Sequence, residues 1–508
     1  MRSKQAMKNL LSNLILQVIV FVVGIILPRF FLEEYGSTVN GMVTSINQFL
    51  TYMGLAEAGV GTASVVALYA PLADKQQDDI NSILSATRLF YYRSGMIFIA
   101  LVTGLVVIYP YLISKQLPAN MVRMMIVVLA SSTLVDYLFL GKYKVILTAM
   151  QRGYVVAIAQ SVGTVMNMVI SILLIEIHAN VVLVKAVATG AYILRFFVVR
   201  WYVKKQIPEI NFKVEPNYKA LSQRGAALLH QVVGIIVNNT DVVILTVMLG
   251  SRSLVEVSVY SIYNMIISAV YTLLNVFANG LTAGFGEVIS KKENDVLNKS
   301  FSSFEYMYFI VFYIVCICVC GLLLPFVKIY TMNVKDAEYV RPLAAFLFIL
   351  IVFLQNIRVP GMTMICAAGH FKETQPQAIR EAAINLVVSL LLVKKFGMVG
   401  VLFGTVCSYG YRSIEIILYN RKYLVLGSGK KTWQRIIRNT LVALIIGVIG
   451  YKVIPVDMLS YTQWFLYAII FGIISSCFTI GINYIFEPEE FRELIVRVLR
   501  IIKKDNNV

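Results

Sequence analysis

Long apolar segments separated by short polar links follow one another along the whole of this 508-residue chain. A helix needs about 20 apolar residues to cross a bilayer, and roughly fourteen segments reach that length. Hydrophobic residues make up 58% of the chain and charged residues only 14%, which is too little charge for the surface of a soluble protein of this size. The sequence therefore predicts an all-α polytopic membrane protein with about 14 transmembrane helices.

The expected spans fall into two groups of six and a final pair. The first group comprises Leu10–Phe31, Gly41–Tyr69, Leu89–Ile113, Met121–Leu140, Val155–Ile177 and Val181–Trp201. The second group comprises Ala226–Leu249, Val255–Val288, Phe304–Tyr330, Tyr339–Ala368, Ala378–Val393 and Val399–Tyr419. The final pair is Ile436–Ile454 and Trp464–Phe486.

A weak internal repeat supports this grouping, because the link LADKQQDDINSI after the second span resembles ISKKENDVLNKS after the eighth. Spans six apart then share an orientation, as in transporters built from two parallel lobes. The expected parts are an N-terminal lobe (1–205), a cytoplasmic linker (206–224), a C-terminal lobe (225–422), the final helix pair (423–486) and a tail (487–508). The tail alternates apolar and basic residues at helical spacing, which predicts a helix on the inner membrane surface.

Basic residues give the chain a net charge of +18 and concentrate in every second link. This bias places those links, and both termini, in the cytoplasm. The basic residues sit between apolar segments, so anionic phospholipids are the expected partner and nucleic acid is not.

Once the polar links and the flanking ends of the spans are set aside, four arginines remain within the bilayer, where an unpaired charge is costly: Arg29, Arg195, Arg358 and Arg412. Guanidinium groups match phosphate with paired hydrogen bonds, so these residues are candidates for a cationic chamber that binds a diphosphate substrate. Pro360 follows Arg358 and favours a kink. Two alternatives remain open, namely that Arg412 pairs with Glu415 one turn away and that Arg195 extends to the inner surface.

Three acidic residues are further candidates at membrane depth: Glu57, Asp136 and Asp241. Asp241 follows Asn238 and Asn239, which together form a polar stripe on the seventh span. Such groups are candidates for binding a proton or a sodium ion, or for balancing an arginine. Structural pairing is the favoured interpretation.

Catalytic and cofactor motifs are not expected in this chain. The three histidines lack the partners of a metal site or a catalytic triad. The string LGSGKKT has Leu424 where a P-loop needs its first glycine and lies in a basic link, which argues against ATP binding. We therefore expect no metal, no cofactor and no enzymatic activity.

Several stretches resemble the polysaccharide transport family (oligosaccharide or O-antigen flippases, Wzx-like) of the multidrug, oligosaccharidyl-lipid and polysaccharide exporter (MOP) superfamily. They are Pro28–Arg29 with YGSTVNG, then GLAEAGVGTASVVALYAPLA, YKVILTAMQRGY and NNTDVVILTVMLG. The resemblance implies a bacterial inner-membrane flippase that moves polyprenyl-diphosphate-linked oligosaccharide outward by alternating access. It implies a role in capsule, exopolysaccharide or O-antigen assembly, beside a polysaccharide polymerase. In related lipid II flippases, arginines near the end of the first span face the chamber, and Arg29 occupies the comparable place.

Two other functions remain as alternatives. A cation-coupled drug antiporter of the same superfamily would favour acids over arginines in its chamber. A membrane polysaccharide polymerase or ligase would need a large outer loop for its catalytic groups, whereas every expected outer loop is short.

Overall fold

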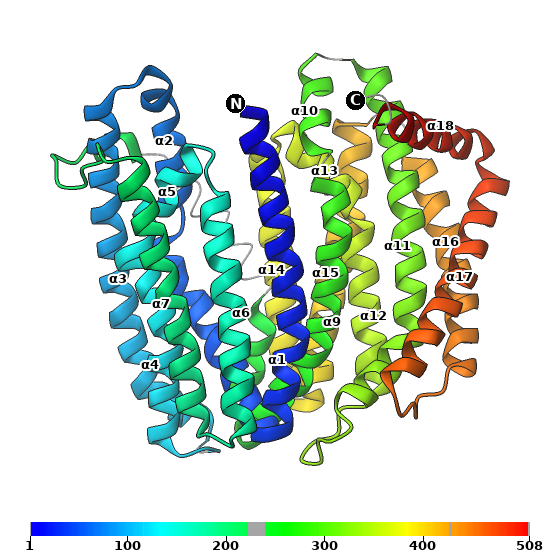
Figure 1. Ribbon diagram of the computed structural model, residues 1–508. Helices are drawn as coiled ribbons and strands as arrows, with labels where there is room; N and C mark the ends of the chain where they lie inside the picture. Colours follow the sequence, from blue (N-terminus) through cyan, green and yellow to red (C-terminus); the bar gives the residue numbers. More distant parts are fainter. Residues whose placement is uncertain are drawn as a thin grey trace. The chain divides into compact units, whose positions relative to one another are not determined.

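The computed structural model describes residues 2–114, 116–221, 239–279, 281–291, 293–425 and 429–505. Within these ranges the chain forms helices and turns and no β-strand (Figure 1). The first elements are α1 (Arg2–Met53), the 3₁₀ turn η1 (Gly54–Glu57), α2 (Val60–Asp74), α3 (Gln77–Leu112), α4 (Ala119–Val135), the π-helical turn η2 (Asp136–Leu140), α5 (Gly141–Ala149), α6 (Tyr154–Glu176) and α7 (Val181–Gln206). A 3₁₀ turn η3 (Lys219–Leu221), a short helix at Asn239–Met248 and a 3₁₀ turn η4 (Gly250–Arg252) follow.

The remaining elements are α9 (Ser253–Asn279), α10 (Thr282–Ser290), α11 (Asn294–Tyr330), α12 (Pro342–Ile357), α13 (Val359–Ala368), α14 (Phe371–Phe396), α15 (Met398–Tyr423), α16 (Gly429–Val453), α17 (Tyr461–Phe486) and α18 (Pro488–Asp505). Eleven described stretches are long and apolar enough to cross a membrane. One of them, Met7–Asp74, contains the first two expected spans. The expected seventh span is described only from Asn239 onward, and α15 covers the expected twelfth. The all-α polytopic prediction is thus confirmed.

The first two expected spans are joined without a loop. Gly36, with φ +78°, interrupts the helical path of α1 at the position of the expected outer turn. Glycine adopts this left-handed conformation without the steric penalty that other residues incur. The second expected span is itself broken in its middle by η1 and by Gly59, which also has positive φ. Irregular backbone at membrane depth requires protein or water contacts for its polar groups.

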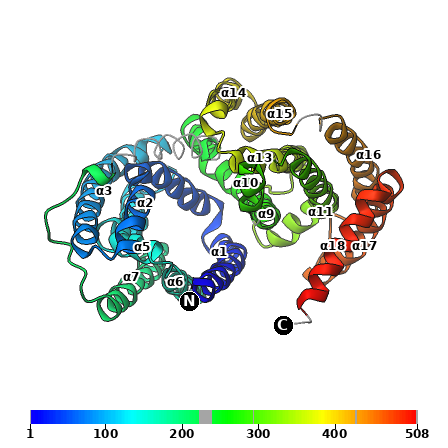
Figure 2. The same ribbon diagram turned by 90° about the horizontal axis from the view of Figure 1, so that it is seen from above.

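Two compact units, Met1–Ser261 and Ile262–Val508, make up the chain. In the first unit, fully buried apolar side chains from α1, α3, α4 and α5 form a continuous core, including Met42, Leu84, Ile126 and Ile146. In the second unit, aromatic residues of α11 form the centre of the core with side chains from α16 and α17, including Phe312, Tyr313, Ile446 and Phe471. The helices α16, α17 and α18 lie together at one side of this unit in both views (Figures 1 and 2). The six-helix repeat itself remains a prediction.

The close approach of α14 and α15 in the second unit depends on small residues. A Cβ atom at Gly404 would lie 2.1 Å from the Ser389 hydroxyl oxygen. Asn385 donates a hydrogen bond of 3.0 Å to the Thr405 hydroxyl across the same interface. Small and polar residues allow helices to pack closely in a membrane, where the hydrophobic effect does not drive association. This packing holds Glu381 of α14 and Arg412 of α15 close together.

Candidate functional site

A buried charged cluster in the first unit is centred on Asp136. Its carboxylate accepts hydrogen bonds from the Arg195 guanidinium at 2.6 Å and from the Lys144 ammonium at 2.8 Å. Arg195 also donates to the Gln160 side-chain oxygen, and its guanidinium carbon lies 5.1 Å from the Tyr192 ring centre. The Arg195 side chain is buried within the helix bundle and does not extend to the inner membrane surface.

The backbone around Asp136 is locally unwound. Asp136 begins η2, a π-helical turn between α4 and α5, and such turns occur often at functional positions. The next residue, Tyr137, donates a hydrogen bond of 2.9 Å to the Gly54 carbonyl in the break of the second span. Beside it, Tyr91 donates to the Glu57 carboxylate at 2.6 Å. Two irregular backbone segments thus meet beside three of the acidic and basic candidates.

The second unit contains a corresponding cluster centred on Glu381 of α14. One carboxylate oxygen pairs with Arg358 and the other lies 3.5 Å from the Arg412 guanidinium. Arg412 pairs in turn with Glu415 at 2.6 Å, which confirms the pairing expected from their spacing. The Arg412 side chain is only 4% exposed, so the cluster exists as a set of mutually neutralising charges.

Arg358 lies where α12 ends and α13 begins. The helix is interrupted at this residue, one turn before Gly361 and directly before Val359–Pro360, as the sequence predicts. The Arg358 guanidinium carbon lies 4.2 Å from the centre of the Tyr409 ring. A guanidinium over an aromatic face is stabilised by the ring quadrupole. The structure therefore holds Arg358 from two sides, by a carboxylate and by a ring.

The two clusters come from spans that the predicted six-helix repeat would pair with one another. Asp136, Gln160 and Arg195 lie on the fourth, fifth and sixth expected spans. Arg358, Glu381 and Arg412 lie on the tenth, eleventh and twelfth. The order of the side chains along the three spans differs. It is acid, amide and base in the first unit, and base, acid and base in the second.

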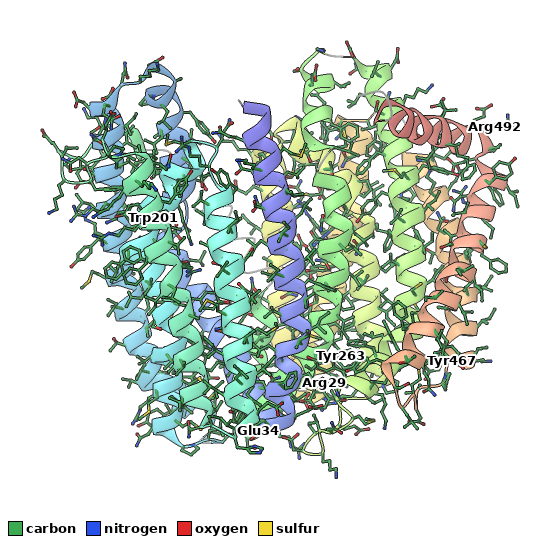
Figure 3. All side chains as sticks on the ribbon, viewed as in Figure 1. Arg29, Glu34, Trp201, Tyr263, Tyr467 and Arg492 are labelled. Carbon is green, nitrogen blue, oxygen red and sulfur yellow. The ribbon has the colours of Figure 1, made fainter. Side chains whose placement is uncertain are left out.

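Arg29 has a different environment from the other three arginines. Its guanidinium pairs with Glu33 one turn along α1 at 3.0 Å, and both side chains are 28% exposed. Figure 3 shows Arg29 close to Glu34 at one end of the first unit, with Trp201 towards the opposite end. The adjacent Phe31 ring lies 4.0 Å from the Lys185 ammonium group. Arg29 is thus a more accessible cation than Arg195 or Arg412.

The polar stripe of the expected seventh span is described in part. Asn238 lies outside the described residues. Asp241 is buried and accepts a hydrogen bond of 3.0 Å from the Tyr260 hydroxyl of α9. Thr240 and Tyr52 hydroxyls lie 2.7 Å apart and tie the same helix to α1. No group of acids, histidines and cysteines suited to a metal ion occurs in the part of the chain that the structure describes.

The sequence analysis did not identify a third charged cluster, which lies in the last helices and is centred on Arg435. Arg435 of α16 is 1% exposed and pairs with Glu305 at 3.0 Å and with Glu487 at 2.6 Å. Arg438 pairs with Glu487 at 2.8 Å. Burial raises the pKa of the Glu487 carboxyl, but the hydrogen bonds and charges of the two arginines outweigh this and lower that pKa overall. This network joins the end of α17 to α11 and α16.

An apolar groove lies between α16 and α17. It has a volume of about 410 Å³ and is lined only by apolar and aromatic side chains, among them Ile446, Ile449, Phe471 and Ile474. Gly450 contributes to its floor, and Tyr467, labelled in Figure 3, lies at one end of α17. The groove is a non-polar surface suited to a hydrocarbon chain.

Comparisons with known proteins identify the fold. Lipid II flippase MurJ in an inward closed conformation matches with a TM-score of 0.68 and 15% identity, over 96% of this chain and 99% of that one. An inward-facing multidrug resistance MATE family transporter matches with a TM-score of 0.66 and 14% identity, over 84% of this chain and 99% of that one. The fold is that of the MOP superfamily transporters.

A MOP superfamily transporter from Pyrococcus furiosus has the same fold, with a TM-score of 0.55 and 14% identity over 84% of this chain and 97% of that one. No protein-family model matches the sequence. No curated protein matches it either. The likeness therefore concerns the MOP-type fold, and the substrate has to be argued from the residues.

Proposed function

We propose that this protein is a flippase that moves polyprenyl-diphosphate-linked oligosaccharide across a bacterial cytoplasmic membrane by alternating access. The observation that carries the proposal is the likeness to the lipid II flippase over 96% of the chain. The MATE likeness spans 84%. The lipid II flippase matches a larger part of this chain than the MATE transporter does. The larger match favours a substrate of the flippase kind, with both a polar headgroup and a lipid tail.

Arg358 and Arg29 are the proposed contacts of the diphosphate. Each already holds one carboxylate, Glu381 or Glu33. A diphosphate carries more negative charge than a carboxylate and offers paired oxygen acceptors to a guanidinium. Substrate binding would therefore exchange one anionic partner for another and leave no buried cation unpaired. Arg195 and Arg412 would support the clusters from within.

The groove between α16 and α17 is the proposed site of the polyprenyl tail. Its lining is entirely apolar, and each CH₂ group buried there gains about 0.8 kcal/mol. The tail would remain in this groove or in lipid while the headgroup crosses. Release of the oligosaccharide to a polysaccharide polymerase would complete the cycle.

Glu57, Asp136 and Asp241 are the proposed candidates for coupling to protons or sodium ions. Glu57 is a stronger candidate than Asp136, because its described contact is the neutral Tyr91 hydroxyl, whereas Asp136 pairs with Arg195 and Lys144. A carboxylate without a fixed cationic partner can change its protonation state at lower cost than one in an ion pair. Both chain termini are proposed to lie in the cytoplasm.

The experiment is a flipping assay with the purified protein in liposomes and a fluorescent polyprenyl-diphosphate oligosaccharide. We expect Arg358→Ala to abolish accelerated flipping, because the diphosphate loses its deepest cationic contact. The matched variant Arg358→Ala/Glu381→Ala removes both charges, so that no buried carboxylate is left with Arg412 at 3.5 Å as its remaining cation. It should melt at close to the wild-type temperature and still fail to flip the substrate. Full activity in this double variant would refute the proposed role of Arg358.

A cation-coupled drug antiporter is the second candidate, since a multidrug MATE transporter shares the fold. The same liposomes distinguish the two functions. Export of a cationic dye against a pH or sodium gradient, with no flipping of the oligosaccharide lipid, would establish the antiporter and reject the flippase.

A further inference from the structure

Three basic side chains from three helices of the first unit gather at the end that carries the N-terminus. They are Arg88 of α3, Lys142 of α5 and Arg200 of α7. The positive charges of Arg88 and Arg200 lie close enough to the Lys142 ammonium to repel it. None of the three forms an ion pair with any carboxylate among the described residues. This end of the unit is the one that the charge pattern predicts to be cytoplasmic.

Aromatic rings form the floor of this basic cluster. The Lys142 ammonium lies 5.1 Å from the Phe212 ring centre and 5.2 Å from the Tyr143 ring centre. Arg88 donates a hydrogen bond of 3.1 Å to the Phe212 carbonyl. The Arg200 guanidinium carbon lies 5.7 Å from the Phe196 ring, which packs in turn on Tyr143. The rings hold the cations in place without neutralising them.

The segment after α7 is fixed in position to complete this arrangement. The backbone N–H of Asn211 donates to the Asn81 side chain at 2.9 Å, and that of Val214 donates to the Ser85 hydroxyl at 3.1 Å. Figure 1 shows the segment passing from the end of α7 to the side of α3. These contacts place Phe212 between Arg88 and Lys142. The cluster is therefore a built structure and not a chance meeting of mobile side chains.

Charge balance distinguishes these three cations from the arginines of the charged clusters described above. Asp136, Glu381 and Glu487 neutralise the arginines around them. Like charges brought together without an acid repel one another, and the repulsion grows as the site is shielded from water. An anion bound among the three cations would remove that cost. Phosphate is the matching anion, because it accepts several hydrogen bonds from guanidinium and ammonium groups at once.

The surroundings favour the phosphate of a lipid. Phe197 and Trp201 lie one turn before and directly after Arg200, and their side chains are 59% and 62% exposed. Exposed aromatic residues of this kind mark the membrane interface. An amphiphile with its phosphate on the cations and its chains along α7 would satisfy both surfaces.

We propose that Arg88, Lys142 and Arg200 form a binding site for the phosphate of an anionic phospholipid on the inner membrane surface. This site is separate from the charged clusters proposed for the transport substrate. It would tie the segment that follows α7 to the composition of the surrounding bilayer.

The test is lipid binding by the full-length protein, purified in a neutral detergent and titrated with phosphatidylglycerol while native mass spectrometry counts bound lipid. Phosphatidylcholine, inorganic phosphate and polyprenyl diphosphate serve as parallel probes. We expect Arg88→Gln/Lys142→Gln/Arg200→Gln to weaken phosphatidylglycerol binding at least about tenfold, because three cationic contacts are lost. Binding of phosphatidylcholine should not change.

The matched control is Lys204→Gln/Lys205→Gln/Lys219→Gln, which removes the same charge from exposed positions near this end of the first unit. It should retain phosphatidylglycerol binding. An equal loss in both triple variants would overturn the proposal, because general surface charge would then explain binding. Selective loss of polyprenyl diphosphate or inorganic phosphate, with phosphatidylglycerol unaffected, would also overturn it. If the triple variant does not fold, the single variants Lys142→Gln and Lys142→Arg are compared instead. Lys142→Gln should weaken phosphatidylglycerol binding, and Lys142→Arg should retain it.

Discussion

The charged clusters of the two units each join three expected spans but balance their charges differently. In the first unit, one acid, Asp136, pairs with two bases, Arg195 and Lys144. The Gln160 side-chain oxygen accepts a further hydrogen bond from Arg195. In the second unit, two acids and two arginines alternate, and Glu381 bridges the arginines. The second cluster is also more enclosed, with Glu381 and Arg412 almost completely buried.

This difference shows how the cost of a buried charge is met in each unit. Lys144 is 34% exposed and can reach water, and Arg195 has a second acceptor. Arg358 is 14% exposed, and Glu381 is its one ion-pair partner among the described residues. Removing the central acid should therefore be far more damaging in the second unit. The two conservative substitutions Glu381→Gln and Asp136→Asn test this directly.

Of the two substitutions, Glu381→Gln should lower the free energy of unfolding more. It leaves Arg358 buried without a counter-ion and removes one partner of Arg412. Breaking a buried pair from one side costs about 3–5 kcal/mol, so the free energy of unfolding in detergent should fall by about that amount. Thermal or denaturant unfolding of the purified protein measures the change.

The control for Glu381→Gln is Glu287→Gln, whose carboxylate pairs with Lys291 one turn away in an exposed position. An exposed pair contributes about 0–1 kcal/mol, so this variant should unfold like the wild type. If Glu381→Gln also unfolds like the wild type, Glu381 is not the acid that holds the cluster together.

Asp136→Asn should have an intermediate effect. The asparagine oxygen can still accept from Arg195, and Gln160 remains in place. The loss is that of a charge-assisted hydrogen bond, about 1.5–3 kcal/mol, reduced for Lys144 because water reaches that side chain. A destabilisation equal to or larger than that of Glu381→Gln, measured in the same unfolding experiment, would reverse the comparison between the two units.

The positions of the spans and some local pairs follow from the sequence. Apolar length alone predicts the helices, and a separation of three residues predicts the Arg412–Glu415 pair. The interruption at Arg358 follows from Pro360, which restricts the backbone before it. These features depend only on residues close together along the chain.

Partners distant in the chain did not follow from the sequence. Glu381 lies in the first turn of an expected span and reads as an interfacial acid, yet it bridges arginines on two other helices. Arg435 precedes an expected span and reads as a solvated base, yet it is almost completely buried. Which acid meets which base depends on helix rotation and packing, and a single apolar pattern does not specify these.

The exposed His178–Glu34 pair should contribute less to stability than either buried cluster. The His178 ring nitrogen lies 2.8 Å from the Glu34 carboxylate, next to the Gly36 interruption of α1. The hydrogen bond with Glu34, followed by the charge of Glu34, raises the pKa of His178 above its ordinary value of 6.5. Because the folded-state pKa is raised, the pair stabilises this contact below pH 6.5 and is lost as the pH rises through the higher value.

Hydrogen exchange around Gly36, corrected for the intrinsic effect of pH, should therefore show slightly more protection at pH 6 than at pH 8.5 in the wild type. His178→Gln should remove this difference, because glutamine does not titrate. His370→Gln should keep it, since His370 contacts the Tyr419 hydroxyl and no part of α1. The effect should be the smallest of the three, because water screens a pair in which the histidine side chain is 79% exposed. Equal protection at both pH values in the wild type would show that pairing with Glu34 does not persist at the surface, and that the charged contacts of this fold depend on burial.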